Sequence, residues 1–412
     1  MSAQDGAVRT ALVVGHFCPL PATHGNRRRL LSLFAWLRAR GLRIVFVLQP
    51  TVVDDTSLIA ELANVVDHCI VTSQAPRALS SFLGRIPVLW RLNRLSWKDG
   101  HVNRVSWKDG DVDRVCWPAT AAAVKTAVCR YDPLVVISVY PFFSRVFRRL
   151  PTRILKVIDT PEVFQRHAAE RERAGFPTRF SADSETKALK RADVLIAIQK
   201  NDAQALREIA PTKRVVTVGY SSASLLPRSS KVESGVILYV ASSNEYNRHG
   251  LMMFLEHAWR PILRAYPEAA LHVVGALTEN IIGAHERVVF MGTVLDNLEV
   301  ARRYASAHVV INPQVSGTGL KIKSVEAISA GSPVVMNAAG ADGIEEGSGT
   351  AFLLAGGWKE FSDGVLRILT DEPFRLTLER GASRFARQRF SVEAVFQEFA
   401  AVLDQHEASV LA

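Results

Sequence analysis

Short apolar runs rich in valine and isoleucine alternate along the chain with longer segments that have apolar residues at helical spacing. In the first half these runs lie at residues 10–17, 43–49, 67–73, 133–140, 153–159, 193–199 and 214–219. Strands of nearly continuous hydrophobicity are buried on both faces, and their alternation with helices is typical of a parallel sheet covered by helices. The pattern therefore predicts an N-terminal α/β domain over residues 1–219.

The same pattern starts again after a serine-rich stretch that contains a proline. This stretch, YSSASLLPRSSKVESG, spans residues 220–235 and is interpreted as a linker. Apolar runs then follow at 236–242, 270–276, 287–292, 308–314 and 332–337. They predict a second α/β domain over 236–390, followed by a C-terminal helix over 391–412 that can pack back on the N-terminal domain. Two doubly wound domains joined by a linker leave a cleft at the carboxyl ends of their strands, where open α/β sheets bind ligands.

Composition and length agree with a folded protein of two domains. The chain has 412 residues, of which 48% are apolar and 22% are charged. It has no apolar run long enough to cross a membrane and no apolar leader, so we expect a cytoplasmic protein. Its four cysteines are scattered and form no CxxC pair, which favours a reducing compartment over a disulfide framework.

Charge divides unevenly between the two halves. Residues 1–218 contain 33 basic and 19 acidic side chains, a net of +14, whereas the remainder contains 17 and 21, a net of −4. A basic N-terminal domain suits an anionic membrane surface or a phosphorylated substrate, or it is a soluble surface without a partner. Nucleic acid is not expected, because the basic residues form no recognised nucleic-acid module.

Two unusual segments lie between 81 and 117. The sequence NRLSWKDGHV at 93–102 is followed by NRVSWKDGDV at 103–112 and DRVCW at 113–117, a repeat of ten residues. Asp-Gly pairs favour turns, so the repeat predicts stacked hairpins or loops, and the alternative is a local duplication without a special role. Residues 81–97 interleave aromatic and basic side chains, as a membrane-surface element does, or as an amphipathic helix packed on its own domain does.

The stretch GTGLKIKSVEAISAGSPVV, at 317–335, follows a predicted strand and combines a glycine-rich turn with a helix that stops at Gly331. Glycines let a backbone approach a ligand closely, and the N-terminus of a helix favours an anion. Lys321 and Lys323 add positive charge, and Glu326 lies one helical turn beyond Lys323. Local chemistry therefore predicts a site for a nucleotide diphosphate, and the alternative is a capped helix with solvent-exposed lysines. Neither GxxxxGK[ST] nor GxGxxG occurs in this stretch.

Together with ASAHVVINPQ before it, this stretch resembles the donor-binding signature of the retaining GT-B glycosyltransferases of family 4, the glycosyl transferases group 1. Segments 16–47, 156–166, 191–206, 236–275 and 288–294 resemble further parts of that family in the same order. The resemblance implies two Rossmann-like, doubly wound parallel-sheet domains that face a cleft. It also implies transfer of a sugar from a UDP- or GDP-linked donor, with retention of configuration and without a cofactor or metal.

The resemblance implies roles for residues of the glycine-rich stretch. Gly317 would belong to the donor-binding loop, and Gly319 and Leu320 would offer backbone N–H groups to the donor diphosphate. Lys321 or Lys323 would supply the counter-charge.

Further roles follow for residues elsewhere in the chain. Glu326 would bind the ribose, and Val294 would lie near the base. Gly25 and Asn26, in the loop before the first helix, would reach the diphosphate or the acceptor. Arg248, in SSNEYNRHG, would contact the donor.

The chain departs from the family pattern at two positions. The family has a pair of glutamates eight residues apart. Glu326 corresponds to the second of them, but Thr318 stands at the position of the first. The family also has an arginine and a lysine after the first strand of its second domain, where this chain offers Arg248 alone. Three functions therefore remain open: transfer to a glycan or lipid-linked acceptor at the cytoplasmic membrane face, transfer to a soluble small molecule, and a binding protein that has lost catalysis.

Asp159 is the candidate general base, because it ends a predicted strand that points toward the cleft. Its alternative role is the N-cap of a helix over 161–174. The sequence DVD at 111–113 superficially matches the metal motif of a different glycosyltransferase fold, but it lies inside the repeat and no metal is assigned to it. The expected partners are a nucleotide sugar, a glycan or lipid-linked acceptor and an anionic membrane surface.

Overall fold

The computed structural model describes residues 9–22, 24–50, 56–72, 111–173, 181–222, 228–277 and 285–411. The chain divides into two compact units, the first with residues 1–18, 37–159 and 179–193 and the second with 19–36, 160–178 and 194–412. Among the described residues, no helix is both long and apolar enough to span a bilayer.

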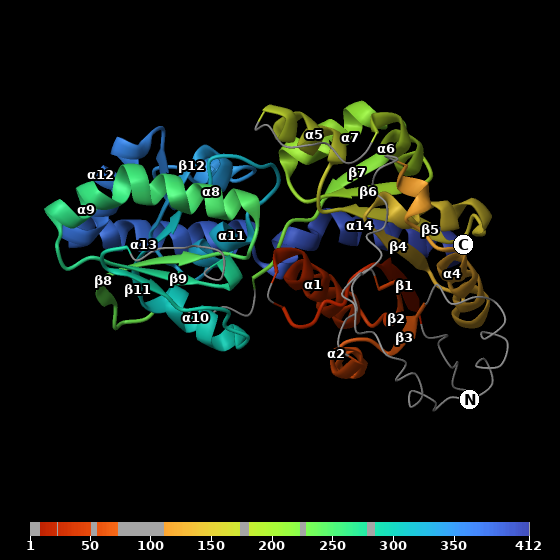
Figure 1. The fold of residues 1–412 in the computed structure, drawn as a ribbon. Helices are drawn as coiled ribbons and strands as arrows, with labels where there is room; N and C mark the ends of the chain where they lie inside the picture. Colours follow the sequence, from red (N-terminus) through yellow and green to blue (C-terminus); the bar gives the residue numbers. More distant parts are fainter. Residues whose placement is uncertain are drawn as a thin grey trace, which may run out of the picture. The chain divides into compact units, whose positions relative to one another are not determined.

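Seven strands form the first sheet, in the order β3-β2-β1-β4-β5-β6-β7 (Figure 1). Its strands are β1 (Thr10–Gly15), β2 (Arg43–Leu48), β3 (His68–Val71), β4 (Val135–Val139), β5 (Leu155–Thr160), β6 (Val194–Ala197) and β7 (Arg214–Thr217). In the parallel register Val13 of β1 lies between Phe46 and Ile137, and all three side chains are buried. The apolar runs of the first half therefore do form buried parallel strands.

Six parallel strands form the second sheet, in the order β10-β9-β8-β11-β12-β13. Its strands are β8 (Glu233–Val240), β9 (Ala270–Val274), β10 (Val288–Phe290), β11 (Ala307–Asn312), β12 (Val334–Asn337) and β13 (Leu353–Ala355). The chain order reverses between β8 and β11, which makes this pair the switch point of the sheet. These two sheets confirm the predicted α/β class, although β13 lies outside the predicted runs.

Helices cover both faces of the second sheet, as Figure 1 shows. One face carries α10 (Asn297–Ser306), α11 (Ile322–Ser329) and α13 (Glu372–Arg389), and its core includes Leu238, Val310 and Tyr304. The other face carries α8 (Glu245–Phe254), α9 (Arg260–Ala265) and α12 (Trp358–Thr370), around Phe254 and Phe361. The sheet is therefore buried on both sides, and only its edges and strand ends are open to a ligand.

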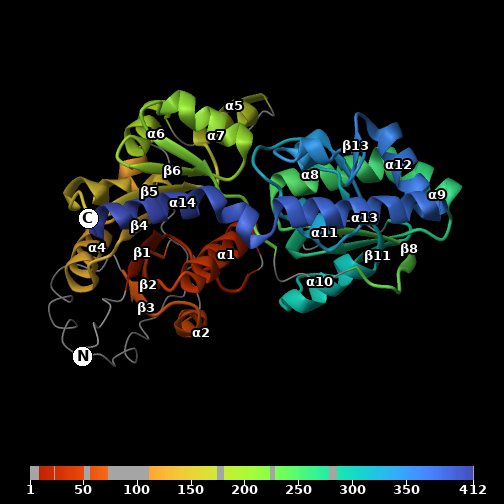
Figure 2. The same ribbon diagram turned by 180° about the vertical axis from the view of Figure 1, so that it is seen from behind.

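Among the described residues, the other α-helices and the longest 3₁₀ helix belong to the N-terminal half or end the chain. They are α1 (Gly25–Ala39), α2 (Thr56–Glu61), α4 (Pro118–Tyr131), α5 (Phe164–Arg173), α6 (Ala182–Leu189), α7 (Lys200–Ile209), α14 (Val392–Leu411) and the 3₁₀ helix Pro141–Arg149. Figure 2 shows α14 running on from α13. Within the second unit, Phe396 of α14 stacks on Trp36 of α1 with ring centroids 4.5 Å apart, and Glu398 accepts from Thr217 N at 2.9 Å.

The aromatic and basic segment 81–97 and the repeat up to residue 110 lie outside the described residues. The last part of the repeat, 111–117, is described and contains DVD. Its Asp111 carboxylate accepts from Asp113 N at 3.0 Å, and Asp113 accepts from Arg191 Nη2 at 2.7 Å. Among the described residues, no three His, Cys, Asp or Glu side chains gather as a metal site would require.

All four cysteines are free thiols. Cys18 and Cys116 are buried, Cys69 is half-buried and Cys129 is exposed on α4. Burial raises the pKa of Cys69 and of Cys116 to about 12. These two thiols therefore stay protonated and unreactive near neutral pH.

Candidate functional site

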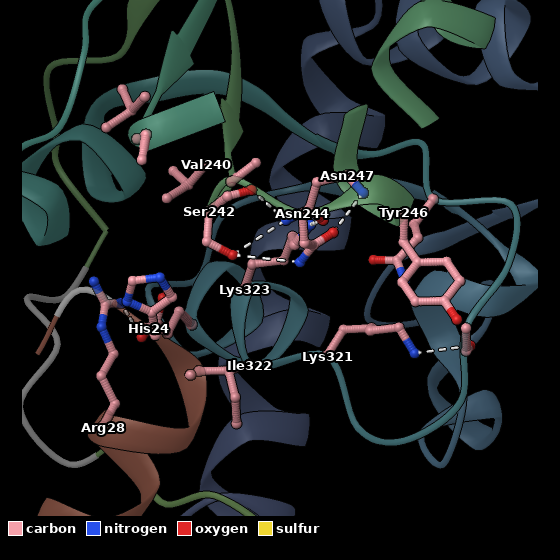
Figure 3. Close-up of a pocket in the computed structure, with 18 of the residues that line it drawn as sticks. His24, Arg28, Val240, Ser242, Asn244, Tyr246, Asn247, Lys321, Ile322 and Lys323 are labelled. Carbon is pink, nitrogen blue, oxygen red and sulfur yellow. Dashed lines mark hydrogen bonds and ion pairs between the residues drawn. The ribbon is translucent and has the colours of Figure 1, made fainter. Parts of the chain in front are cut away.

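A cavity of about 300 Å³ lies where the chain leaves the strands of the second sheet (Figure 3). Its walls come from residues 240–247 after β8, 274–276 after β9, 293–294 after β10 and 314–326 after β11, with contributions from 24–28 and 162–167. All of these residues belong to the second unit. The cavity thus lies at the switch point, the expected ligand position in an open α/β sheet.

Backbone conformations available mainly to glycine shape two walls of the cavity. Gly317 and Gly319 have φ values of +100° and +84°, and Gly275 has +118°. A Cβ at Gly275 would lie 2.1 Å from Ala241 O, so no side chain fits between the ends of β8 and β9. At Gly25, a Cβ would lie 2.8 Å from the Ile322 side chain. Glycine at these positions keeps the walls close together.

The Lys321 side chain stabilises the glycine-rich loop by hydrogen bonds to its backbone. Its buried Nζ donates to Gly317 O at 3.1 Å and to Gly319 O at 2.6 Å. Burial lowers the pKa of Lys321 to about 8, although Asp342 and Asp202 favour its charged form. Its ammonium group therefore holds the loop conformation in addition to carrying charge.

The start of α11 presents a row of open backbone donors. Lys321 is the N-cap residue but makes no side-chain cap, and Gly319 N donates to Asp342 Oδ2 at 2.8 Å. The next four backbone N–H groups, at residues 320–323, have no hydrogen-bond partner among the described residues. Such a row at a helix N-terminus is a ready site for an anion.

Lys323 stands beside this row and faces the β8–α8 turn, as Figure 3 shows. Its Nζ donates to Asn247 Oδ1 and lies 4.9 Å from the centroid of the Tyr239 ring. Asn247 is fixed by its own bonds, from its Nδ2 to Ser242 O at 2.8 Å and from its N to the N-cap Asn244 Oδ1 at 2.8 Å. Burial, together with the neighbouring lysine, lowers the pKa of Lys323 to about 7.

Glu326 is the buried carboxylate of the site. Its Oε1 accepts from Arg28 Nη1 and from Tyr220 OH at 3.3 Å. Arg28 is held in turn by a bond from its Nε to Ala22 O at 2.7 Å. The buried hydroxyl of Tyr304 lies beside the same carboxylate, and Glu326 lines the cavity.

A carboxylate and an imidazole lie beside Thr318, the position where the family pattern has a glutamate. Thr318 Oγ1 is 3.5 Å from His167 Nδ1, and this nitrogen is 3.4 Å from Glu162 Oε1. All three residues line the cavity. The cavity therefore has a carboxylate here that comes from the segment after β5 instead of from the loop after β11.

Asp342 anchors the glycine-rich loop from below. Besides the Gly319 N–H, it accepts from Arg166 Nη2 at 3.1 Å, Asn201 Nδ2 at 2.9 Å and Gln199 Nε2 at 3.2 Å. Although burial favours the neutral acid, the bonds from Asn201 and Arg166 hold the pKa of Asp342 below its usual range. The ionised carboxylate thereby ties together segments that are far apart in the sequence.

The structure brings most of the predicted site residues together. Those that line the cavity are Gly25, Val294, Gly317, Thr318, Leu320, Lys321, Lys323 and Glu326. Gly319 lies in the same loop, bonded to Asp342. Asn26, Arg248 and Asp159 are not lining residues: the first two are exposed at helix starts, and Asp159 is buried in β5 of the first unit.

Residues that the sequence reasoning missed are Arg28, Glu162, His167, Tyr220, Asn247 and Asp342. Asn244 was missed as well, although it carried a usable signal, because an asparagine before a glutamate at the start of a helix is typical of an N-cap. The others gave no local signal, since each meets the site through contacts with distant segments.

Comparison with known families gives one match. Residues 234–371 match the family model described as Glycosyl transferases group 1. None of the curated protein sequences matches the chain.

Solved structures with similar folds match nearly the whole chain. Sucrose-phosphate synthase from Thermosynechococcus elongatus is 17% identical with a TM-score of 0.70, and the match covers 97% of this chain and 100% of that one. HepE of Anabaena in complex with UDP-glucose is 14% identical with a TM-score of 0.64, over 96% and 99%. WaaG, a glycosyltransferase involved in lipopolysaccharide biosynthesis, is 16% identical with a TM-score of 0.57, over 95% and 99%. The two Rossmann-like domains thus have the GT-B glycosyltransferase fold.

Proposed function

We propose that this chain, a GT-B protein whose residues 234–371 match the glycosyl transferases group 1, transfers a sugar from a nucleotide diphosphate sugar to a glycan or lipid-linked acceptor, with retention of configuration. The observation that carries the proposal is the row of four open N–H groups at 320–323, beside Lys323 and the cavity-lining carboxylate of Glu326. A ribose diphosphate matches these groups, because its phosphates accept hydrogen bonds from the N–H row and its ribose hydroxyls donate to the carboxylate.

Each part of the nucleotide sugar is assigned to a different group of residues that line the cavity. The diphosphate accepts from the N–H groups of Leu320 and of the three residues after it, and the ribose hydroxyls donate to the Glu326 carboxylate. The base lies toward Val294 and Gly275. The sugar lies toward Thr318, where Glu162 and His167 contact its hydroxyls. The similarity to a protein solved with UDP-glucose supports a UDP-linked donor.

Catalysis then rests on position and on charge. The acceptor hydroxyl attacks the face from which the diphosphate departs, so no enzyme nucleophile is required. Charge that develops on the departing diphosphate is stabilised by the N–H row and by Lys323, without a metal. Asp159, the base expected from the sequence, is buried and does not line the cavity, so no residue is assigned as the base for the acceptor proton.

The similar structures bear on the acceptor and on the location of the protein. A similar structure belongs to an enzyme of lipopolysaccharide biosynthesis, which supports a glycan or lipid-linked acceptor at the cytoplasmic membrane face. Another belongs to a sucrose-phosphate synthase, which favours a soluble acceptor as the second candidate.

Nucleotide release tests the proposal directly. Purified protein is incubated with UDP- or GDP-sugars and with glycan, lipid-linked or small soluble acceptors, and free UDP or GDP is measured. We expect acceptor-dependent release that is lost in Lys323→Ala. If the protein binds UDP-glucose but releases neither nucleotide with any acceptor, the third function, a binding protein without catalysis, replaces the proposal.

The affinity for UDP-glucose is expected to fall as pH rises through 7. Lys323 has its pKa lowered to about 7 in the free protein, and a bound diphosphate favours the protonated form. Affinity is therefore highest below pH 7 and falls on the order of tenfold between pH 6.5 and 8.5, with proton uptake on binding. UDP-glucose is the suitable probe because its diphosphate lacks the monoester group that titrates near pH 6.

Calorimetry in two buffers of different ionisation heat measures this proton uptake. Lys323→Arg is the matched control, because arginine keeps its charge throughout this range. Its affinity should vary much less with pH. An equal pH dependence in Lys323→Arg and in the unchanged protein would assign the titration to another group.

A further inference from the structure

A second cavity, of about 840 Å³, lies in the first unit and is separate from the donor site. It is lined by α4, which Figure 1 labels, by the 3₁₀ helix Pro141–Arg149 and by residues 150–153, and we call it the α4 groove. Its aliphatic floor consists of Ala121, Val124, Val128, Val146 and Leu150. Its rim carries five cations: Lys125, Arg145, Arg148, Arg149 and Arg153.

The positive charge of the rim is largely uncompensated. Among the described lining residues Asp132 is the one acidic side chain, and it pairs with Arg153 at 2.5 Å. Arg148 pairs with Asp113 at 3.5 Å, so two of the five rim cations have a carboxylate partner. Lys125 and Arg149 are exposed and make no hydrogen bond or ion pair with the described residues. Arg145 donates only to backbone carbonyl groups. Lys125, Arg145 and Arg149 are therefore available to bind an anionic ligand.

The combination of rim and floor selects an amphiphile. A sugar or a free nucleotide would leave the aliphatic floor in contact with water or with hydroxyls. A single-stranded nucleic acid would need aromatic side chains on which its bases stack, but none of the described residues that line the groove is aromatic. A phosphate attached to an apolar chain matches both parts, because basic side chains attract anionic lipid headgroups and apolar surfaces contact acyl chains.

We propose that the α4 groove docks the protein on a membrane surface by binding an anionic phospholipid. The lipid phosphate contacts Lys125, Arg149 and Arg153, and the glycerol and first acyl carbons cover the floor at Ala121 and Val128. This docking concerns the first unit and does not depend on the donor chemistry proposed above.

Vesicle flotation tests the docking with the full chain. Vesicles are made from phosphatidylglycerol and phosphatidylcholine in equal parts, or from phosphatidylcholine alone. We expect the protein to float with the anionic vesicles and to remain behind with the neutral ones. Added salt should weaken the binding without abolishing it, because the phosphate is held in a groove and not only by screened surface charge.

Two double variants with the same change in net charge separate the groove from general basicity. Lys125→Glu with Arg149→Glu reverses two rim cations. Arg130→Glu with Lys190→Glu reverses two exposed cations outside the groove, and Arg130 shares α4 with Lys125. The groove variant is expected to bind anionic vesicles at least about tenfold more weakly, and the control variant within about threefold of the unchanged protein.

Three outcomes would overturn the proposal. Equal loss in both double variants would mean that net charge alone drives binding. Retained binding in the groove variant would assign docking to another part of the chain, such as residues 81–97. Absence of vesicle binding together with groove-dependent binding of an RNA oligonucleotide would replace the lipid by a nucleic acid. UDP-glucose affinity, measured on both variants, should be unchanged and shows that they are folded.

Discussion

Glu326→Gln is expected to lower the free energy of unfolding by about 3 kcal/mol and the affinity for UDP-glucose by about a hundredfold or more. The stability loss follows because the Arg28 guanidinium, with 16% of its side chain exposed, loses the carboxylate that compensates its burial. The affinity loss follows because a glutamine at this position offers a ribose a neutral acceptor in place of a charged one. Denaturant unfolding and calorimetric titration measure the two effects.

The double variant Arg28→Met with Glu326→Gln separates these two roles. Methionine removes the uncompensated charge and fills a similar volume, so most of the lost stability should return. The affinity for UDP-glucose should not return, because the carboxylate is still absent. Recovery of both quantities together would show that Glu326 acts only through the packing of α1 on α11.

Asp342→Ala is expected to cost about 3–5 kcal/mol of stability and to raise KM for the donor at least about tenfold. The alanine leaves the buried donors Gly319 N and Gln199 Nε2 without acceptors and leaves Arg166 with Asp202 as its remaining partner. The glycine-rich loop then loses its anchor, so the N–H row is no longer held in place for the diphosphate. Thermal unfolding and donor saturation kinetics check both expectations.

Two further substitutions make the Asp342 result interpretable. Asp363→Ala removes a carboxylate of similar size whose side chain is 56% exposed and pairs with Lys359, and it should change stability by less than about 0.5 kcal/mol. Asp342→Asn keeps an acceptor for Gly319 and should recover KM more fully than stability. If KM follows stability equally in Asp342→Ala and Asp342→Asn, the loop-positioning role is wrong.

Most strands could be predicted from the sequence, because a strand that is buried on both faces is an uninterrupted run of apolar residues. Residues 43–49 and 332–337 contain uninterrupted apolar stretches, IVFVL at 44–48 and VVM at 334–336, and they include β2 and β12. The edge strand β13 was not predicted, although it lies in a short apolar run, AFLLA at 351–355, in which Leu353 is half-buried and Leu354 is exposed. The strand order was not predictable from these runs either, because it depends on pairings between segments far apart in the sequence.

The candidate site was predictable only where its chemistry is local. The loop at 317–319 and the start of α11 follow one another in the sequence, so glycine, lysine and glutamate could be read as one unit. Lys321 was expected to serve as a counter-charge, but its bonds to two loop carbonyls give it a structural task that composition does not reveal. Asp342 and His167 reach the loop through tertiary contacts, and no spacing rule points to them.

Cys129 allows the α4 groove to be labelled with a thiol reagent. Of the four cysteines, Cys129 is the one classed as exposed, and it lines the groove, whereas burial keeps the thiols of Cys69 and Cys116 protonated. A thiol-specific fluorophore therefore attaches to the native sequence at a single preferred point, without engineered cysteines. That point sits among the rim cations, so the dye reports the polarity of whatever occupies the groove.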